Sequence, residues 1–504
     1  DLTLGLEVAD REKNSHGSVD GVTAAEEDPK SKDPAYTDYA NRFDVRLQKY
    51  YLTYSRDLAG GGNVMANGYF YGDSTDFVTA PTDADGDGNE DDYTYDNDYE
   101  QAQRGFKAEY RDSAGGLAWM AGTDLRANYY ESKETYRITT SDYKGNTFNP
   151  GDLAGDNRTD EQVLAAYGEL KFRPLEPLTL TLNGRWDQIE LDYEDSLDSA
   201  NDGSESFGIP SGRLGANYAV GENLDVYGNV STGFRAPTPD QLFVGDYSIT
   251  GTTEPNSDLD PEYAINKELG LRGRSIIGGV AWRGSLAVFQ IDRDDYIMRT
   301  VGTYTGPSAG EESKFANVGG VRHRGLELSL QSDPERQVSV DLAYTYLDAE
   351  YTSYDTYNLI VWDDSAGYGG TGGLVIGETV DNTGNQVPRT PHHTVNAIVD
   401  WRPMQGLTLT AEGVYESSYY ADETNRIEID GHKLLHLRAN YEMEAPSGVR
   451  WNLFARVENA LDEDYYNTAR GYRDSDQDGD FDGEDLSIVV NPGTTWTAGL
   501  SAEF

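Results

Sequence analysis

The amino-acid sequence predicts an all-β protein that forms a transmembrane, antiparallel, up-and-down β-barrel. Three observations lead to this prediction. Apolar and polar residues alternate with a period of two, and tight turns alternate with long acidic loops along the chain. No apolar run reaches the roughly 18 residues that a membrane-spanning helix needs. The mean hydropathy of -0.67 is compatible with this fold, because only one face of each barrel strand contacts lipid.

Composition narrows the classes of function. The 504 residues carry a formal net charge of -49, which disfavours a nucleic-acid partner, and the absence of cysteine excludes disulfides and thiolate sites. Tyrosine (36) greatly exceeds phenylalanine (14), as in barrels with aromatic girdles at the membrane interfaces. An extracellular solenoid or sandwich shares this composition, so the strand pattern has to separate the alternatives.

The clearest strand is Leu178-Thr-Leu-Thr-Leu-Asn-Gly-Arg-Trp186. Three leucines and Trp186 occupy one face, and Thr, Asn and Arg occupy the other, as expected of a strand between lipid and water. Residues 407–415 repeat the pattern. About eighteen such runs can be marked, near 1–10, 42–57, 62–79, 98–112, 116–138, 161–174, 178–194, 207–219, 223–233, 262–274, 279–299, 313–331, 337–352, 385–402, 407–421, 432–443, 449–459 and 494–504.

The connections between these runs are of two kinds. Tight turns lie at 112–116, 220–223, 333–337 and 445–448, and long acidic loops lie near 11–41, 80–97, 139–160, 234–261, 353–384 and 464–493. Strict alternation of short and long connections places all long loops at one end, which is the asymmetry of an outer-membrane barrel. The closing run ends on Phe504, which resembles the C-terminal signal by which bacterial outer-membrane barrels are inserted.

Five further motifs follow the segment Tyr227-Gly-Asn-Val-Ser-Thr-Gly-Phe-Arg-Ala-Pro-Thr and Gln241-Leu242. They are found at 256–262, 268–272, 317–327, 387–393 and 457–466. Together and in this order, the motifs resemble those of TonB-dependent outer-membrane receptors.

The resemblance implies a receptor or transporter in the outer membrane of a Gram-negative bacterium, with outer-membrane lipid around it. The implied ligand is a small molecule such as a metal chelate: a ferric siderophore first, cobalamin or an oligosaccharide as alternatives. Uptake in the family is energised by a TonB-type complex through an N-terminal plug domain, and the barrel has about 22 strands. We therefore expect residues 1–504 to form the barrel, with the plug and the first hairpins absent. A plugless pore or a surface scaffold is the alternative function, and no set of acid, base and nucleophile indicates an enzyme.

Two acidic loops have the spacing of calcium-binding loops. Residues 474–485 match D-x-D-x-D-G with an acid at position twelve, which predicts side-chain ligands from Asp474, Asp476, Asp478 and Asp485 and a carbonyl ligand from Asp480. Calcium prefers six to eight such hard oxygen ligands. The second loop offers Asp83, Asp85 and Asp87, but Thr94 stands at position twelve. No other cofactor is expected, and a solvated acidic loop is the alternative in both cases.

Arg322 and Arg324 share one face of their strand. If that face lines the lumen, they would either attract an anionic cargo or, as we favour, pair with neighbouring lumen carboxylates.

Overall fold

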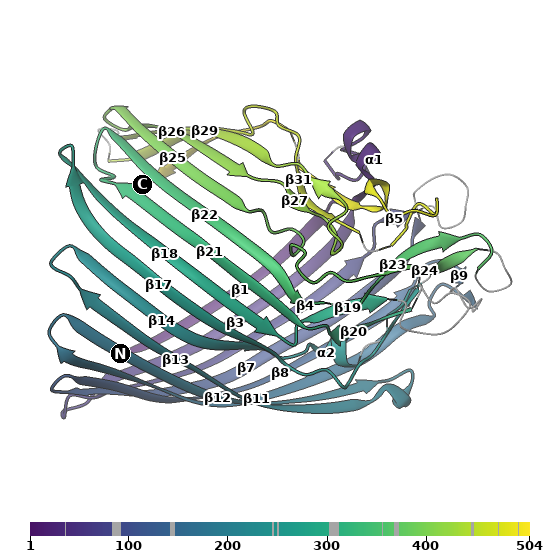
Figure 1. Ribbon diagram of the computed structural model, residues 1–504, viewed down its shortest axis with the longest axis horizontal. Coiled ribbons are helices and arrows are strands. Elements are labelled where there is room, and N and C mark those ends of the chain that lie inside the picture. Colours follow the sequence, from purple (N-terminus) through teal and green to yellow (C-terminus); the bar gives the residue numbers. More distant parts are fainter. Residues whose placement is uncertain are drawn as a thin grey trace.

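The computed structural model shows a tilted barrel of long strands, with the tight turns at one end and the long loops at the other (Figure 1). The structure describes residues 1–35, 37–82, 92–141, 147–243, 246–248, 251–301, 312–354, 356–366, 372–444, 448–471, 473–491 and 493–503. No helix among these residues is both long and apolar enough to cross a membrane.

The barrel wall is one antiparallel sheet of 18 strands, which confirms the predicted fold class and strand number. Each strand pairs with its neighbours in chain order, from β1 at one edge to β33 at the other. The wall strands are β1 (Leu2–Ser15), β3 (Asn41–Asp57), β4 (Asn63–Val78), β7 (Tyr95–Ala114), β8 (Leu117–Tyr136), β11 (Leu153–Leu175), β12 (Leu178–Asp195), β13 (Gly203–Ala219), β14 (Leu224–Arg235), β17 (Glu262–Ile277), β18 (Val280–Asp294), β21 (Gly320–Ser332), β22 (Val338–Ser353), β25 (His393–Met404), β26 (Leu407–Glu416), β29 (His432–Glu444), β30 (Arg450–Glu458) and β33 (Thr495–Glu503).

Four predicted runs differ from the observed strands. The run at 279–299 spans β18 and part of β19 (Ile297–Val301), and the run at 407–421 spans β26 and β27 (Tyr419–Tyr420). The run at 313–331 is two elements, β20 (Glu312–Asn317) and β21, because Gly319 adopts a positive φ of 108° between them. The run at 385–402 enters the wall only at His393, after the two prolines that precede it. A proline cannot donate to a strand ladder, so the loop continues to that point.

The wall has an apolar outer face and a polar inner face. On β12, Leu182 and Trp186 are exposed on the outer face, whereas Asp187 is buried on the inner face. The outer face therefore presents the side chains that lipid solvates, and the inner face presents those that water and ion pairing stabilise.

Aromatic rings on the inner face lie over glycines of the neighbouring strand. A Cβ at Gly270 of β17 would overlap the ring of Tyr227 on β14. The same arrangement joins Gly122 to Tyr167. Glycine is required at these positions because the ring occupies the space of the missing side chain.

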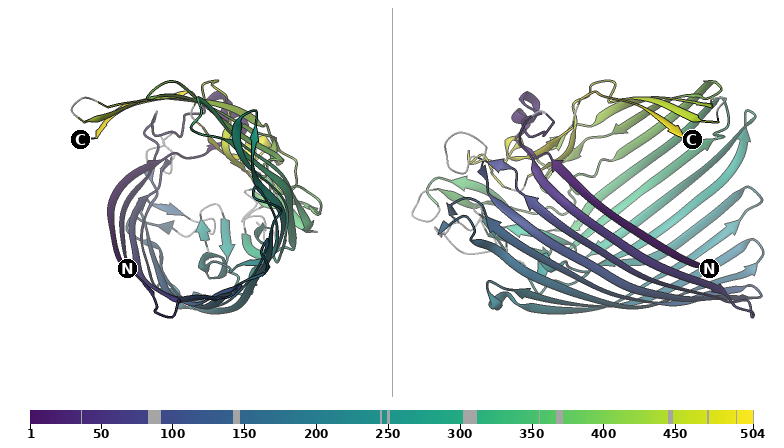
Figure 2. Two further views of the ribbon diagram at one scale, coloured as in Figure 1. Left: turned by 90° about the vertical axis from the view of Figure 1, so that its left-hand side faces the viewer. Right: turned by 180° about the vertical axis from the view of Figure 1, so that it is seen from behind.

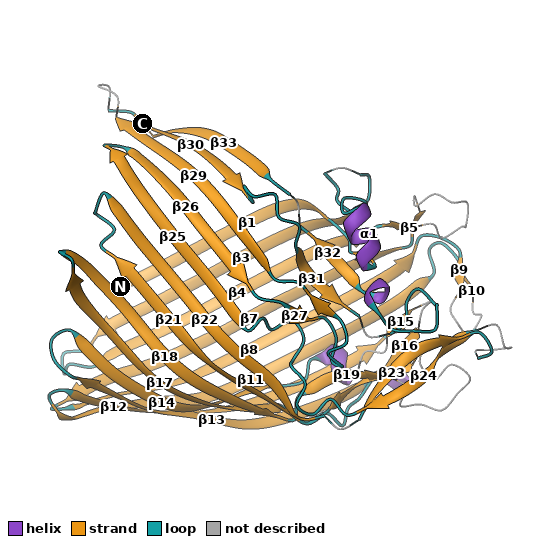
Figure 3. Cartoon of the chain, turned by 45° about the horizontal axis from the view of Figure 1, so that its top comes forward, coloured by secondary structure: helices purple, strands orange, loops and turns teal. Residues whose placement is uncertain are grey.

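The loop end carries short elements that cover the outer mouth (Figure 3). Helix α1 (Val22–Glu27) and the three-stranded sheet β2-β32-β31 form one group, and α2 (Pro239–Leu242) with the sheet β15-β16-β20-β19 forms another. The remaining short strands form hairpins. All the short strands of the loop end, in the small sheets and in the hairpins, have these bounds: β2 Val19–Asp20, β5 Pro81–Thr82, β6 Asp92–Tyr93, β9 Thr140–Ser141, β10 Thr147–Phe148, β15 Asp246–Ser248, β16 Gly251–Glu254, β19 Ile297–Val301, β23 Tyr357–Asp363, β24 Gly373–Val380, β27 Tyr419–Tyr420, β28 Glu428–Ile429, β31 Tyr466–Arg470 and β32 Ser487–Val490. Single 3₁₀ turns lie at Ser199–Asn201 and Gly483–Asp485.

Apolar cores at the mouth attach these loops to the wall. In one core, Leu242 and Phe243 pack with the inner-face residues Ile189 and Leu191. In a second, Phe481 packs with Tyr351, Tyr354 and Tyr357. The loops therefore fold against the inner wall, and Figure 2 (left) shows short elements inside the ring of strands.

Candidate functional site

A cavity of about 600 Å³ lies in the lumen between the wall and helix α2. Its volume is within the range of small-molecule sites. The wall contributes inward-facing side chains of β4, β7, β8 and β11, since the exposed apolar residues of these strands, such as Phe106 and Leu125, stand at alternate positions. The lining includes Tyr71, Gln101, Gln103, Asn128, Thr159 and Glu161 from the wall and Pro239 and Asp240 from α2.

Helix α2 is held over this cavity by local capping and by burial. The chain leaves β14 after Arg235, and Thr238 and Gln241 form a capping box that closes the short helix. Leu242 and Phe243 are buried, and the ring of Phe243 stacks on Tyr193 of β12 with centroids 5.6 Å apart. Because these residues anchor α2 to the wall, Asp240 is held at the cavity.

The charged side chains around the cavity differ in whether they have an ion-pair partner. Arg126 pairs with Glu161 at 3.3 Å, and Asn128 donates to the same carboxylate. Asp240 makes no ion pair within the part of the chain that the structure describes. Gln101 makes no side-chain hydrogen bond there either. The cavity therefore presents free amide groups and one carboxylate without a cation.

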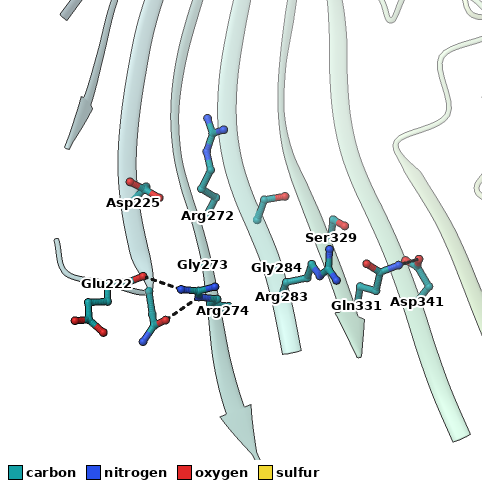
Figure 4. A pocket seen from close by; sticks show the side chains of 12 residues that line it. Glu222, Asp225, Arg272, Gly273, Arg274, Arg283, Gly284, Ser329, Gln331 and Asp341 are labelled. Atoms are coloured by element: carbon teal, nitrogen blue, oxygen red, sulfur yellow. Dashed lines mark hydrogen bonds between the residues drawn. The ribbon is translucent and has the colours of Figure 1, made fainter. Parts of the chain in front are cut away.

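Figure 4 shows a second hollow, of about 560 Å³, at the tight-turn end of the lumen. Its lining carries three arginines, Arg272, Arg274 and Arg283 from β17 and β18, and three carboxylates, those of Glu222, Asp225 and Asp341. Arg274 donates to the Asn223 side chain at 2.8 Å, and Arg272 lies 4.3 Å from the ring centroid of Tyr227. The charges of this hollow are therefore balanced, with as many carboxylates as guanidinium groups.

Glu262 connects the wall to the loops at the outer mouth. Its side chain is 2% exposed and pairs with Arg235 of β14 and Arg293 of β18. The same carboxylate accepts a hydrogen bond of 2.9 Å from the backbone N–H of Ile297, a residue of the first apolar core. Charged hydrogen bonds of this kind are stronger than neutral ones, so Glu262 fixes where β19 starts.

The loop at 474–485 brings three of its predicted ligands together. One carboxylate oxygen from each of Asp474, Asp476 and Asp478 lies within 4.8 Å of the other two. The N–H of Gly479 donates to Asp474 at 2.8 Å, and Gly479 takes the positive φ of 95° that the sharp turn requires. Asp480 is exposed, and its side chain accepts from the N–H of Phe481.

Asp485 stands apart from that group. Its carboxylate is buried and accepts from the N–H groups of Ser475, Asp476 and Asp482. Burial raises the pKa of Asp485, and Asp474 adds to this effect, while the backbone donors act in the opposite sense. The second predicted loop, with Asp83, Asp85 and Asp87, lies outside the described residues.

The acidic loop is also tied to the rest of the mouth. The N–H of Trp362 in β23 donates to Asp474 at 2.9 Å. Phe481, between the acidic positions, is 4% exposed within the tyrosine core. The loop is therefore part of the packed outer mouth.

Arg322 and Arg324 do pair with carboxylates, but on the outer face of the wall. Arg322 pairs with Asp292 at 2.7 Å, and Arg324 pairs with Asp348 at 2.8 Å. Asp292 shares its strand face with the exposed Val288, and Val321 is buried on the opposite face. The expectation that they pair within the lumen is wrong. Alternation along β21 places Arg322 and Arg324 on the face of Leu326, Leu328 and Leu330, which is the outer, lipid-side face.

Sequence reasoning did not identify the residues around the cavity. Gln101 and Gln103 lie in a run whose alternation predicts a strand, and their shared face was a usable signal of lumen position. Asp240 carried no such signal, since it lies in an irregular segment after two prolines.

Comparison with known proteins agrees with this architecture. The family model described as TonB dependent receptor-like, beta-barrel matches residues 3–460. A crystal structure of the ferric citrate transporter FecA superposes with a TM-score of 0.70 at 18% identity, covering 100% of this chain and 67% of that one. The siderophore receptor PiuA of Acinetobacter baumannii gives a TM-score of 0.71 at 15% identity, covering 99% and 71%.

Curated relatives match over shorter segments. The ferrichrome outer membrane transporter/phage receptor of Escherichia coli is 26% identical over 31% of this chain and 18% of its own length. The probable TonB-dependent siderophore receptor PiuA of Acinetobacter baumannii is 22% identical over 58% and 35%. The matches therefore span about a fifth to a third of these relatives. With its 18-stranded wall, short turns at one end and matching family model, the chain belongs to the TonB-dependent receptor β-barrel family and is an outer-membrane protein of a Gram-negative bacterium.

Proposed function

We propose that this chain is the barrel of an outer-membrane receptor that takes up a scarce small molecule, a ferric siderophore, into the periplasm. The observation that carries the proposal is the lumen cavity beneath α2, which is walled by polar side chains and bounded by a loop anchored to the wall. Most of the relatives' names refer to siderophores or iron, including ferrichrome and ferric citrate, and one is a vitamin B12 transporter; we favour the iron chelate because it is the most frequent of these ligands.

The parts of the barrel have separate roles in this proposal. The apolar outer face holds the wall in lipid, and the inner face provides a water-compatible path. The loop cores keep the outer mouth in one shape, so that the cavity exists before ligand arrives. Release into the periplasm requires a TonB-type energising complex that acts through a plug domain.

Binding and conductance together test the proposal. Purified protein in detergent should quench its tryptophan fluorescence saturably when a ferric siderophore is added, and should not respond to the iron-free chelator. Expression of the complete gene should restore growth of a receptor-deficient strain on that siderophore as sole iron source. Saturable binding without growth would restrict the role to a surface scaffold, and a steady open conductance in planar bilayers without binding would establish a pore instead.

We also propose that the loop 474–485 binds a structural calcium ion. The support is the carboxylate group of Asp474, Asp476 and Asp478, whose oxygens are close enough to share one cation, at the spacing that calcium loops use. Asp485 would have to give up its backbone hydrogen bonds to become the ligand at position twelve. A bound ion would offset the mutual repulsion of these carboxylates and stiffen the mouth.

Limited proteolysis tests the calcium proposal. Millimolar calcium should slow cleavage within 474–485 by about tenfold, and Asp476→Asn should abolish the effect because it removes a ligand. Asp480→Asn is the matched control, since position seven contributes its carbonyl. The proposal fails if calcium leaves the cleavage rate unchanged, or if Asp480→Asn is as harmful as Asp476→Asn.

A further inference from the structure

We propose that the outer wall of the barrel binds the phosphate group of a membrane lipid at Arg322 and Arg324. Both arginines lie on the outer face of β21, in line with Leu326 and Leu328. In the lumen they would have faced an anionic cargo. On the outer face they meet the membrane, where the anion within their reach is a lipid headgroup.

The two arginines stand at the outer edge of the lipid-facing belt. The leucines on the outer face of β21 end at Leu326, and Arg324 and Arg322 continue the row toward the loop end. Tyr346 of β22 pairs with Leu326, so an aromatic side chain marks the membrane interface next to Arg324. The arginines therefore lie at the depth of the headgroups, in the leaflet that meets the long loops.

The guanidinium groups keep donors available for such an anion. Arg322 Nε donates to Asp292 at 2.7 Å, and Arg324 Nε donates to Asp348 at 2.8 Å. Neither arginine makes a hydrogen bond through its Nη nitrogens within the part of the chain that the structure describes. A guanidinium carries five N–H groups, so most of its donors stay open while the carboxylates hold its plane in place.

The Nη nitrogens of the two arginines converge on one carboxylate. Arg322 Nη1 lies 4.0 Å from Glu350 Oε1, and Arg324 Nη2 lies 3.8 Å from Glu350 Oε2. Both distances exceed that of a hydrogen bond, so Glu350 marks a point that both guanidinium groups face without using their donors. A phosphate beside Glu350 can accept from both arginines, because its several oxygens allow it to bridge two guanidinium groups.

The balance of charge on the outer face also favours this position. The outward-facing positions of β17, β18, β21 and β22 carry three cations and four carboxylates, namely Lys267, Arg322, Arg324, Asp292, Asp294, Asp348 and Glu350. By contrast, an outer-face hollow of about 450 Å³ between β4 and β12 is lined by six carboxylates and two cations. In a chain with a net charge of -49, an anionic headgroup therefore meets less repulsion at the two arginines than along those strands.

Lipid binding to the purified protein in a nonionic detergent, measured by native mass spectrometry, tests the inference. The probes are phosphatidic acid and a diacylglycerol with the same acyl chains, because they differ only in the phosphate group. The wild-type protein should bind phosphatidic acid more tightly. Arg322→Gln and Arg324→Gln should each weaken that binding about fivefold, and the double variant about 25-fold, while diacylglycerol binding stays unchanged.

Two further variants separate the site from general effects of charge and folding. Arg46→Gln is the matched control, because Arg46 is an exposed cation on the outer face of β3 that pairs with Asp10, and phosphatidic acid binding should not change. Glu350→Gln removes the carboxylate that both Nη groups face, so phosphatidic acid should bind about fivefold more tightly. A variant that merely folds poorly does not gain affinity.

The outcomes decide between a lipid site and its alternatives. Inorganic phosphate at the concentration of the lipid should not displace it, and displacement would overturn the lipid assignment in favour of a site for free phosphate. Equal binding of the two lipids by the wild-type protein, an unaffected double variant, or weaker binding in Glu350→Gln would each overturn the inference. The receptor function stands in all of these cases, because it does not depend on the outer face of β21.

Discussion

Replacing Glu262 with glutamine should loosen the attachment of β19 and its apolar core to the barrel wall. The carboxylate is almost fully buried and holds three groups: the guanidinium groups of Arg235 and Arg293 and the N–H of Ile297. Glutamine has nearly the same size and keeps one acceptor oxygen. Its second polar atom becomes an N–H donor that would face another donor.

The size of the effect follows from these contacts. A hydrogen bond to a charged group contributes about 1.5–3 kcal/mol, and removing one partner of a buried ion pair costs about 3–5 kcal/mol. The side chains of Arg235 and Arg293 are 41% and 28% exposed, so water recovers part of the loss. We expect a local destabilisation of about 2–3 kcal/mol, which corresponds to roughly 30- to 150-fold more frequent opening.

Amide hydrogen exchange, followed by mass spectrometry on the barrel in detergent, measures this opening directly. Peptides that contain Ile297 should exchange about 30- to 150-fold faster in Glu262→Gln, while peptides from β12 should not change. Glu268→Gln is the matched control, because Glu268 faces inward on the same strand and makes no ion pair among the described residues. Equal exchange in the two variants, or acceleration spread evenly over the wall, would refute the anchoring role of Glu262.

Two further predictions concern the wall and the mouth. Gly270→Ala should lower the free energy of unfolding by about 1–3 kcal/mol, because the new methyl group displaces the ring of Tyr227. Urea unfolding of the barrel in lipid vesicles measures this free energy. Gly233→Ala is the control and should have a far smaller effect, because Gly233 has open space around it. Burial, with a smaller contribution from Asp422, raises the pKa of Glu423 to about 7 from 4.5. The folded loop therefore keeps a proton that the unfolded loop releases, so its stability should fall as pH rises from about 4.5 to 7 and then level off. Exchange of the loop around Glu423 should show this dependence, and Glu423→Gln should abolish it; a pH-independent wild-type loop would contradict the burial of this carboxyl group.

Strand positions could be predicted from the sequence because the period of two is a local property. The run from Leu178 to Trp186 shows which residues share a face, and the tight turn before it shows where the hairpin closes. The spacing of the acidic residues from Asp474 to Asp485 likewise predicts the sharp turn at Gly479. Such patterns need no knowledge of distant contacts.

The cavity could not be predicted because its walls come from residues far apart in the chain. Asp240 lines it together with Gln103, and the segment between them contains five wall strands with their own registers. The orientation of Arg322 differs from this case, because it shares its strand face with Leu326 and Leu328 and could be assigned to the lipid side from the sequence. Alternation along the chain determined that this protein builds a barrel with one loop-rich mouth. Only the tertiary structure decided which loop folds inward and which charges it brings to the lumen, because those depend on long-range packing of apolar side chains such as Leu242 and Phe243.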